Sequence, residues 1–195
     1  MKLVMKNSNR IDRRTIYTVN VIKDSFLELI QDKPYLKISI KEICKVADIS
    51  RSTFYLHFKS INDVLNAILD DAIKMTSPDY LKISNFSIDY LKENESLIPA
   101  CQRVGSSEKY RKLLLDPELA EYIVGRIMIR ERNRVVPAIQ EKTGLSKEDA
   151  ETLFLYTLHG SFAVNRANQF RKNNKWYHDV QLINNFTLNG YNALN

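Results

Sequence analysis

Residues 39–59 of the chain have the sequence SIKEICKVADISRSTFYLHFK, and this stretch predicts two short helices joined by a tight turn. Ser39 is a favourable N-cap and Glu42 follows three residues later, so the two side chains can form a capping box on the first helix. The dipeptide Asp48-Ile49 interrupts the helical spacing of the apolar residues, and Ser50 is a suitable N-cap for the second helix. Helices this short are not stable in isolation, so they need a further helix to pack on.

The second of these helices is predicted to have an apolar side and a hydrogen-bonding side. Phe54 and Phe58 are about one turn apart, so both are expected in the core. The remaining surface carries Arg51, Ser52, Thr53, Tyr55 and His57. Side chains that donate and accept hydrogen bonds suit the base edges and phosphates of a DNA major groove. The stretch therefore favours a helix-turn-helix that binds DNA.

The residues from Ala47 to Lys59, ADISRSTFYLHFK, resemble the helix-turn-helix signature of the tetracycline-repressor (TetR) family. The pattern Thr-Phe-Tyr-x-His-Phe within them is the most specific part. The resemblance in sequence covers residues 10–75. Outside these residues the chain resembles the family in helical architecture and not in motif. It implies an all-α fold, with an N-terminal three-helix helix-turn-helix DNA-binding domain and a C-terminal helical domain for ligand binding and dimerisation.

One position departs from the family pattern. The family commonly has a lysine three residues after Phe58, where this chain has Ile61. The phosphate contact of that lysine is therefore expected to be lost, and Lys59 is expected to contribute instead.

Positive charge is concentrated around the motif. Residues 1–60 contain 12 Lys and Arg against 6 Asp and Glu, whereas residues 61–195 contain 17 of each, so the net charge of +6 arises from the first part. Such an excess is the electrostatic footprint of a nucleic-acid-binding surface. A solvated basic tail is the alternative interpretation, because several of these charges precede Arg14.

The sequence predicts three segments. Glycine and proline are scarce, at five each in 195 residues, which favours helices. Residues 1–12 are expected to form a flexible basic arm, residues 13–76 the DNA-binding domain with a connecting helix, and residues 77–195 the regulatory and dimerisation domain. The second boundary rests on Thr76-Ser77-Pro78-Asp79, where proline and small polar residues end the helical pattern.

Apolar spacing and capping residues predict the individual helices. The first begins between residues 12 and 15 and ends near Gln31, with an apolar stripe that includes Ile16 and Ile30. The connecting helix begins at Ile61, and patterns near 82–94, 95–103 and 106–115 are irregular. Further helices are predicted over residues 117–134, 137–143, 147–170 and 178–194, and Ser146 is the expected N-cap of the helix over 147–170.

The last two long helices carry small residues that permit close helix approach, namely Gly160, Ser161, Ala163, Gly190 and Ala193. The family resemblance implies that these helices pair with those of a second copy. A two-fold homodimer would present two reader helices about 34–36 Å apart to successive major-groove faces.

The expected DNA-binding residues divide by role. Arg51, Ser52 and Thr53 are expected to face the bases, with Arg51 the best candidate for a guanine. Phosphate contacts are expected from Lys41, Tyr55, His57 and Lys59, and the two N-cap residues Ser39 and Ser50 complete this surface. Arg14 is also expected to contact a phosphate. The alternative interpretation is that Arg14 is an ordinary surface arginine.

Catalysis is not expected. His57, His159 and His178 are isolated, and the sequence contains no nucleophile elbow, phosphate-binding loop or zinc motif, so neither a metal nor a cofactor is predicted.

Cys44 and Cys101 lie far apart, which favours a reducing compartment. No segment approaches the ~20 apolar residues of a membrane span, so a soluble cytoplasmic protein is expected.

The resemblance also implies a small apolar or amphipathic effector in the C-terminal domain. The residues expected to line its site are Phe86, Tyr90, Tyr110, Tyr122, Met128, Phe154, Tyr156 and Phe162. The alternative interpretation is that these residues form an aromatic stripe of the ordinary core.

The leading hypothesis for the function is a repressor that binds a palindromic operator and is released by an effector. The alternatives are a DNA-bound adaptor that recruits a protein partner, and an activator or nonspecific DNA-coating protein.

Overall fold

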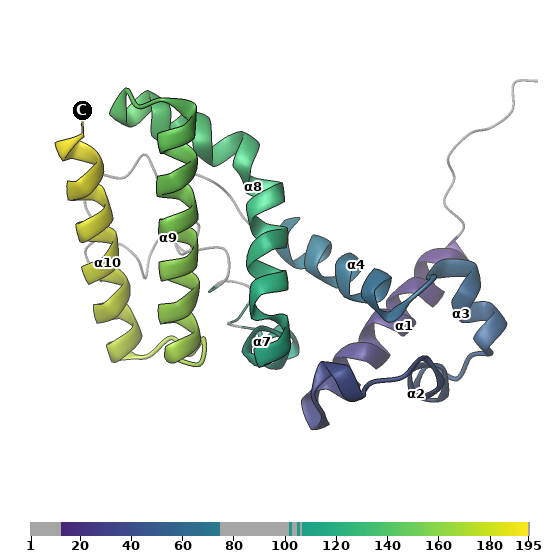
Figure 1. Ribbon diagram of the computed structural model, residues 1–195. Coiled ribbons are helices and arrows are strands. Elements are labelled where there is room, and N and C mark those ends of the chain that lie inside the picture. The colour runs from purple at the N-terminus through teal and green to yellow at the C-terminus, as the bar shows by residue number, and fades with distance from the viewer. Residues whose placement is uncertain (1–12, 75–101, 103–104, 106, 195) are drawn as a thin grey trace, which may run out of the picture. The chain divides into compact units, whose positions relative to one another are not determined.

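The computed structural model describes residues 13–74, 102, 105 and 107–194, and every regular element in these ranges is helical (Figure 1). The protein is therefore all-α, as predicted. Contacts within the chain divide it into two units, Met1–Ile68 and Leu69–Asn195, with the division inside helix α4 (Ile61–Lys74). The boundary predicted at residues 76–77 lies outside the described residues and stays a prediction.

In the first unit, α1 (Arg13–Asp32) packs against α2 (Ile40–Val46) and α3 (Arg51–His57). A 3-10 turn, η1 (Tyr35–Lys37), connects α1 to α2. The buried side chains of this unit's described part include Ile22, Phe26, Ile30, Ile38, Ile43, Phe54, Phe58, Val64 and Leu65. The predicted burial of Phe54 and Phe58 is thus confirmed.

The apolar stripe predicted along α1 is buried in its second half only. Ile22, Phe26 and Ile30 are buried, whereas Ile16 near the N-terminus is exposed. Because α2 and α3 have seven residues each, either helix is about 10 Å long, and α1 with its twenty residues is about 30 Å long. The two short helices therefore cover only part of α1.

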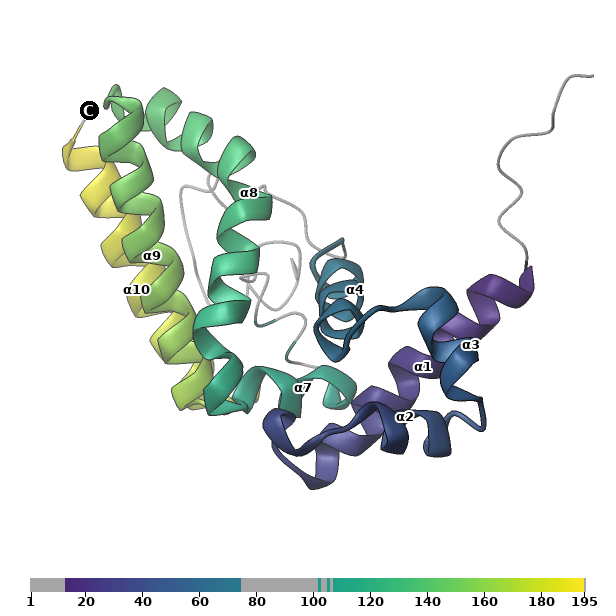
Figure 2. The same ribbon diagram turned by 45° about the vertical axis from the view of Figure 1, so that its right-hand side comes forward.

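In the second unit, α8 (Ala120–Thr143), α9 (Lys147–Ala167) and α10 (Asn174–Ala193) pack on one another, and Figures 1 and 2 show α9 and α10 side by side. The short helix α7 (Glu108–Leu115) and the 3-10 turn η4 (Pro117–Leu119) precede α8 and contact it. A core cluster of Val135, Val136, Ile139, Ala150, Phe154 and Tyr191 joins these three long helices.

Helix α8 corrects one sequence prediction. Separate helices were expected over residues 117–134 and 137–143, but one helix extends from Ala120 to Thr143 with Pro137 inside it. Proline removes one backbone hydrogen bond and bends a helix without necessarily ending it. Figure 2 shows α8 bent in its second half. Val135, Val136 and Ile139 are buried around the proline, so core packing holds the helix together across it.

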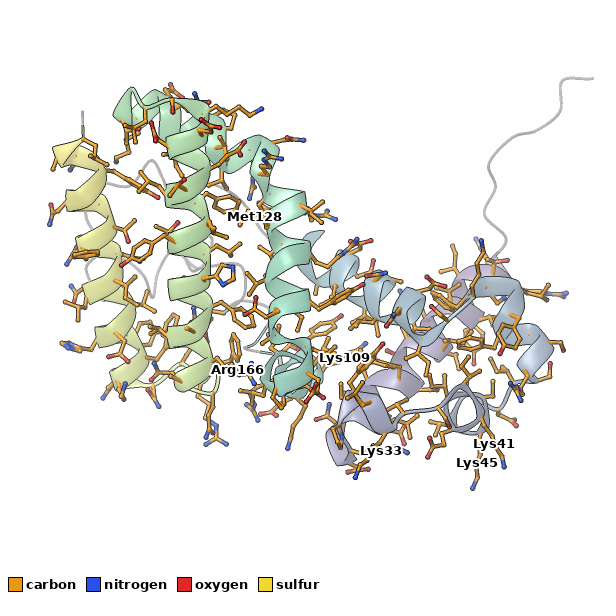
Figure 3. All side chains as sticks on the ribbon, in the orientation of Figure 1. Lys33, Lys41, Lys45, Lys109, Met128 and Arg166 are labelled. Carbon is orange, nitrogen blue, oxygen red and sulfur yellow. The ribbon has the colours of Figure 1, made fainter. Side chains whose placement is uncertain are left out.

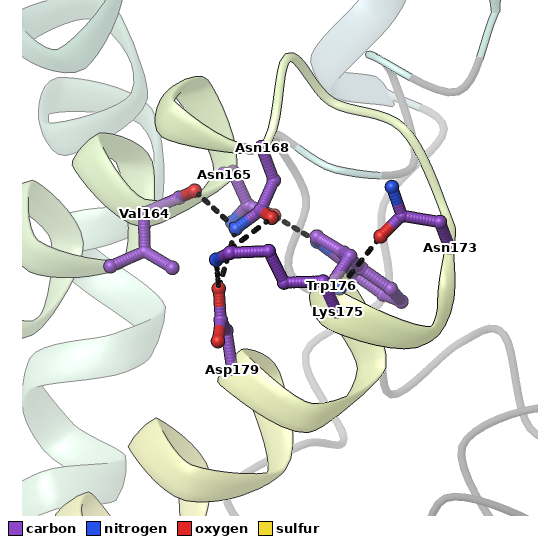
Figure 4. Close-up of polar contacts among 7 residues, drawn as sticks. All are labelled: Val164, Asn165, Asn168, Asn173, Lys175, Trp176 and Asp179. Carbon is purple, nitrogen blue, oxygen red and sulfur yellow. Dashed lines mark hydrogen bonds and ion pairs between the residues drawn. The ribbon is translucent and has the colours of Figure 1, made fainter.

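The connection between α9 and α10 is held by polar side chains (Figure 4). The fully buried Trp176 donates from Nε1 to Asn165 Oδ1 at 2.7 Å, and Asn168 Nδ2 donates to Asp179 Oδ2 at 2.9 Å. The predicted N-cap Ser146 is confirmed, but α9 ends at Ala167 rather than near residue 170. Gln169 and Phe170 turn the chain with φ of 52° and 53°.

Helix α10 begins four residues earlier than predicted. Asn173 is its N-cap and accepts a hydrogen bond from the Trp176 amide at 2.9 Å. Asparagine is among the preferred N-cap residues, so this start was present in the sequence and was missed.

Of the segments that gave irregular patterns, residues 82–94 lie outside the described residues, as does 95–103 except for Gln102. No helix of the described ranges is both long enough and apolar enough to cross a membrane.

Candidate nucleic-acid interface

The helix-turn-helix begins with the capping box predicted from the sequence. Glu42 N donates to Ser39 Oγ at 3.3 Å, and Ser39 N donates to Glu42 Oε2 at 3.0 Å. The Glu42 carboxylate also pairs with the Lys33 ammonium of α1. The hydrogen bond from Lys33, followed by those from Ser39, lowers the pKa of Glu42 to about 2. The start of α2 is therefore tied both to its own cap and to α1.

The turn between α2 and α3 depends on Asp48. This residue adopts φ of 51°, a left-handed conformation that Asp tolerates better than most residues. The Ile49 amide donates to the Cys44 carbonyl at 3.0 Å, which closes the end of α2. Cys44 itself is buried, and burial raises the pKa of its thiol. The turn thus fixes the direction in which α3 leaves α2.

At the start of α3, three hydroxyl groups form a connected cluster. Ser50 Oγ accepts from Thr53 N at 3.1 Å, which confirms the predicted N-cap. The same oxygen is hydrogen-bonded to Ser52 Oγ at 2.7 Å and to Thr53 Oγ1 at 2.9 Å. The structure therefore brings the predicted residues Ser50, Ser52 and Thr53 together at one end of the helix.

Arg51 lies on the exposed surface of α3, one turn from Tyr55. Its Nη2 donates to the Tyr55 hydroxyl at 3.4 Å. This hydrogen bond raises the pKa of Arg51 above its ordinary value. Tyr55 also packs edge-on against the buried ring of Phe54, with ring centroids 5.6 Å apart. The guanidinium is thus held by a side chain that is itself anchored on the core.

The residues expected at phosphates lie around this face. Lys41 and Lys59 are exposed, and His57 is half-buried at the end of α3. Arg14 lies in the first turn of α1 and is exposed. The Ser39 hydroxyl donates to the Glu42 carboxylate at 2.7 Å, so its hydrogen is already used within the cap. None of these DNA contacts is tested by the geometry, and they stay predictions.

Two exposed residues of the helix-turn-helix were missed from the sequence. Lys45 follows Lys41 by one turn of α2, and Figure 3 shows both side chains extending from the same side of that helix. The four-residue spacing of the two lysines was the available signal. Leu56 of α3 is the second, and the available signal was its position two residues from both Phe54 and Phe58, which places it on the opposite side of the helix.

The residues expected to line an effector site lie in different surroundings. Met128 and Phe154 pack in the same core cluster, and Phe162 packs edge-on against Phe170 with centroids 5.8 Å apart. Tyr122 and Tyr156 are exposed. Tyr110 is half-buried, with Lys109 Nζ 5.9 Å from its ring centroid. Phe86 and Tyr90 lie outside the described residues.

Comparison with known proteins identifies the first unit. Residues 24–68 match the family described as "Bacterial regulatory proteins, tetR family". The chain is 30% identical over 87 residues to the HTH-type dhaKLM operon transcriptional activator DhaS of Lactococcus lactis subsp. lactis (strain IL1403). That match covers 44% of this chain and 43% of the activator, so the chain aligns with less than half of its relative's length.

A solved structure is also similar to the chain. It is that of the dihydroxyacetone kinase operon activator DhaS, with a TM-score of 0.44 and 21% sequence identity over 92% of this chain and 98% of the other. The matched range Asp24–Ile68 contains the second part of α1, the capping box, the turn and α3, which are the features built up above. The helix-turn-helix of this chain therefore matches the family of tetR bacterial regulatory proteins, which its motif resembles.

Proposed function

We propose that this protein regulates transcription by binding a specific DNA sequence through α3. The observation that carries the proposal is the outward surface of α3, where hydrogen-bonding side chains are exposed on a helix whose other side is buried. Arg51, Ser52 and Thr53 contact bases, and Arg51 contacts a guanine through its two-pronged guanidinium. The phosphate contacts come from Lys41, Tyr55, His57, Lys59 and Arg14, with Ser39 and Ser50 at the edges of the surface.

The surplus of positive charge in residues 1–60 supports this proposal, because phosphate neutralisation provides most of the sequence-independent affinity for DNA. A regulator of this kind acts in the cytoplasm, where bacterial DNA is accessible. The matching family and the similar proteins are regulators, which supports the prediction that the chain is not an enzyme.

We further propose that the protein acts as a homodimer through α9 and α10. Leu182 and Phe186 of α10 are 62% and 66% exposed, and Leu155 and Tyr156 form an exposed patch on α9. Gly160 and Gly190 are also exposed, and a Cβ added at either would meet no atom of the described residues within 4 Å. Glycine weakens a helix, and packing among the described residues gives no reason for it. Close approach of a second copy supplies such a reason.

The direction of regulation has two candidates. Repression, released by a small-molecule effector, is what the family resemblance implies. Activation is favoured by the similar Lactococcus lactis protein, which is named as a transcriptional activator. A DNA-bound adaptor that recruits a protein partner would also act as an activator.

The experiment that tests the proposed function is selection of bound duplexes from a random DNA pool at two salt concentrations. Recovery of an inverted repeat that is still bound at the higher salt supports a sequence-specific dimer. Recovery of unrelated sequences, with binding lost as salt rises, would contradict it and indicate contacts to phosphates alone. In vitro transcription from a promoter that carries the selected site then separates repression from activation.

A further inference from the structure

The exposed side of α3 has two rows of side chains. Residues four apart on a helix lie above one another, so Arg51 aligns with Tyr55 and Ser52 aligns with Leu56. All four are exposed. At 100° per residue, Ser52 and Leu56 lie about 160° around the axis from the buried Phe54, so their row points most directly away from the core.

The second row ends in an apolar side chain. Leu56 is 81% exposed, which is the highest value among the large apolar side chains of the described ranges. Single exposed leucines are common on protein surfaces. This one, however, lies one turn after Ser52 on the outward side of the helix that carries the base-reading residues, where a polar residue would otherwise be expected.

We propose that Leu56 is a specificity-determining residue, which contacts the C5 methyl group of a thymine in the major groove. This proposal rests on the proposed function and deepens it. Among the groups that base pairs expose in the major groove, the C5 methyl of thymine is the apolar one. The other groups that distinguish the base pairs there are hydrogen-bond donors and acceptors. Leucine offers no hydrogen bond, so placing it over polar edges would remove their water without replacing it.

The neighbouring side chain leaves room for this contact. Ser52 is small, and its hydroxyl is already hydrogen-bonded to Ser50 Oγ at 2.7 Å. Arg51 and Leu56 therefore read DNA by different means. Arg51 reads a guanine by hydrogen bonds, and Leu56 reads a thymine by apolar contact at another position of the same half-site.

The test is a thymine-to-uracil scan of the selected DNA site, measured with the full chain. Uracil lacks only the C5 methyl group and keeps the base-pairing edges. Replacing the contacted thymine should lower the affinity of the unchanged protein about fourfold, the effect of burying one methyl group. In Leu56→Ala the same replacement should have no effect, while Leu56→Met should retain the dependence because it keeps an apolar side chain there.

Leu36→Ala is the matched control. Leu36 is 70% exposed in η1, outside α2 and α3, so the substitution removes the same atoms from a surface of similar exposure. This variant should show the same uracil sensitivity as the unchanged protein. All four proteins should show the same salt dependence, because no phosphate contact is altered.

The proposal is overturned if uracil is tolerated at every thymine by the unchanged protein, or if Leu56→Ala keeps the same sensitivity. Failure of the proposed function would be seen separately, as the absence of any preferred sequence in the selection. Because Leu56 is exposed and alanine favours helices, loss of folding is not expected, and circular dichroism of each variant verifies this.

Discussion

The hydroxyl groups of Ser52 and Thr53 are each hydrogen-bonded to the hydroxyl of Ser50. Arg51 is likewise held by the Tyr55 hydroxyl. Side chains that are already ordered lose less conformational freedom on binding, which favours affinity and a defined register. The surface of α3 is thus prepared for binding by contacts among its own residues.

Arg51→Ala should relax the preference for one base pair of the operator and cost about 1–3 kcal/mol of binding free energy, because a two-pronged contact to guanine is lost. Competition with operators mutated at each position measures both effects. Lys59→Ala is the matched comparison on the same motif. It should weaken binding to all sequences alike and reduce the salt slope by about one. Unchanged affinity and base preference in Arg51→Ala would refute the assignment of the reading surface.

Glu42 should make the stability of the first unit depend on pH. Its folded pKa of about 2 lies below the ordinary value of 4.5, mainly because of the hydrogen bond from Lys33. As the pH falls the unfolded chain takes up the proton first, so the stabilisation is complete above pH 4.5 and is lost as the pH falls towards 2. The difference in free energy of unfolding between the unchanged protein and Glu42→Gln should shrink over this range.

Lys33→Met provides the control for this pH dependence. Without the ammonium partner, Glu42→Gln should produce a smaller pH-dependent difference over the same range. Urea unfolding at several pH values measures it. Because the pair lies at the surface, its contribution should also decrease at high salt. An equally large difference in the Lys33→Met background would show that Ser39 alone sets the pKa of Glu42.

At the scale of elements, local signals in the sequence predicted some boundaries well. The capping residues Ser39, Ser50 and Ser146 marked three helix starts, because a side-chain cap involves only neighbouring residues. Pro137 led to the wrong prediction that a helix ends before it. Core packing keeps α8 continuous across this proline, and packing between helices cannot be inferred from local sequence. Leu56 was missed for a different reason, since the spacing of Phe54 and Phe58 already places it on the side of α3 that faces away from the core.

Trp176→Phe should loosen the connection between α9 and α10. The substitution keeps an aromatic ring in the buried site but removes the Nε1 hydrogen that is donated to Asn165 at 2.7 Å. Weakening a buried hydrogen bond in this way should lower the free energy of unfolding by about 1–3 kcal/mol. Thermal unfolding of Trp176→Phe, of Asn165→Val and of the double variant measures the coupling. Additive effects of the two substitutions would mean that this bond does not join the helices.

Charged side chains also connect elements of the second unit. Arg126 Nη2 lies 2.5 Å from Asp70 Oδ1, and Arg132 Nη2 lies 2.6 Å from Glu151 Oε1. The second half of α4 is thereby joined to α8, and α8 to α9. Arg134 pairs with Glu131, so the guanidinium groups of Arg132 and Arg134 both form ion pairs within the protein. Their clustering in the sequence therefore does not require a phosphate ligand.

At the scale of the whole molecule, the proposed dimer explains why one helix-turn-helix is sufficient per chain. A single reader helix contacts only a half-site, whereas a two-fold pair contacts two half-sites about 34–36 Å apart. Linking two modest contacts raises the overall affinity without any new contact to DNA. Operator binding should therefore depend on association of the second units as well as on α3.

Gly160→Leu should separate association from folding. A Cβ added at this position meets no atom of the described part of its own chain within 4 Å, and leucine favours a helix more than glycine does, by about 0.8–1 kcal/mol. The variant should fold at least as stably as a monomer, but the added side chain would occupy the space that a second copy needs. Sedimentation velocity should then show a monomer, and affinity for the full inverted repeat should fall towards that for a half-site.

Gly125→Leu is the matched control for this substitution. Gly125 lies on α8, is exposed, and likewise has no atom within 4 Å of an added Cβ. It should gain the same helix propensity and remain dimeric. If Gly160→Leu sediments as a dimer and binds the inverted repeat normally, α9 is not at the interface. If Gly125→Leu instead becomes monomeric, the interface includes α8, and the exposed apolar patch on α9 and α10 requires another explanation.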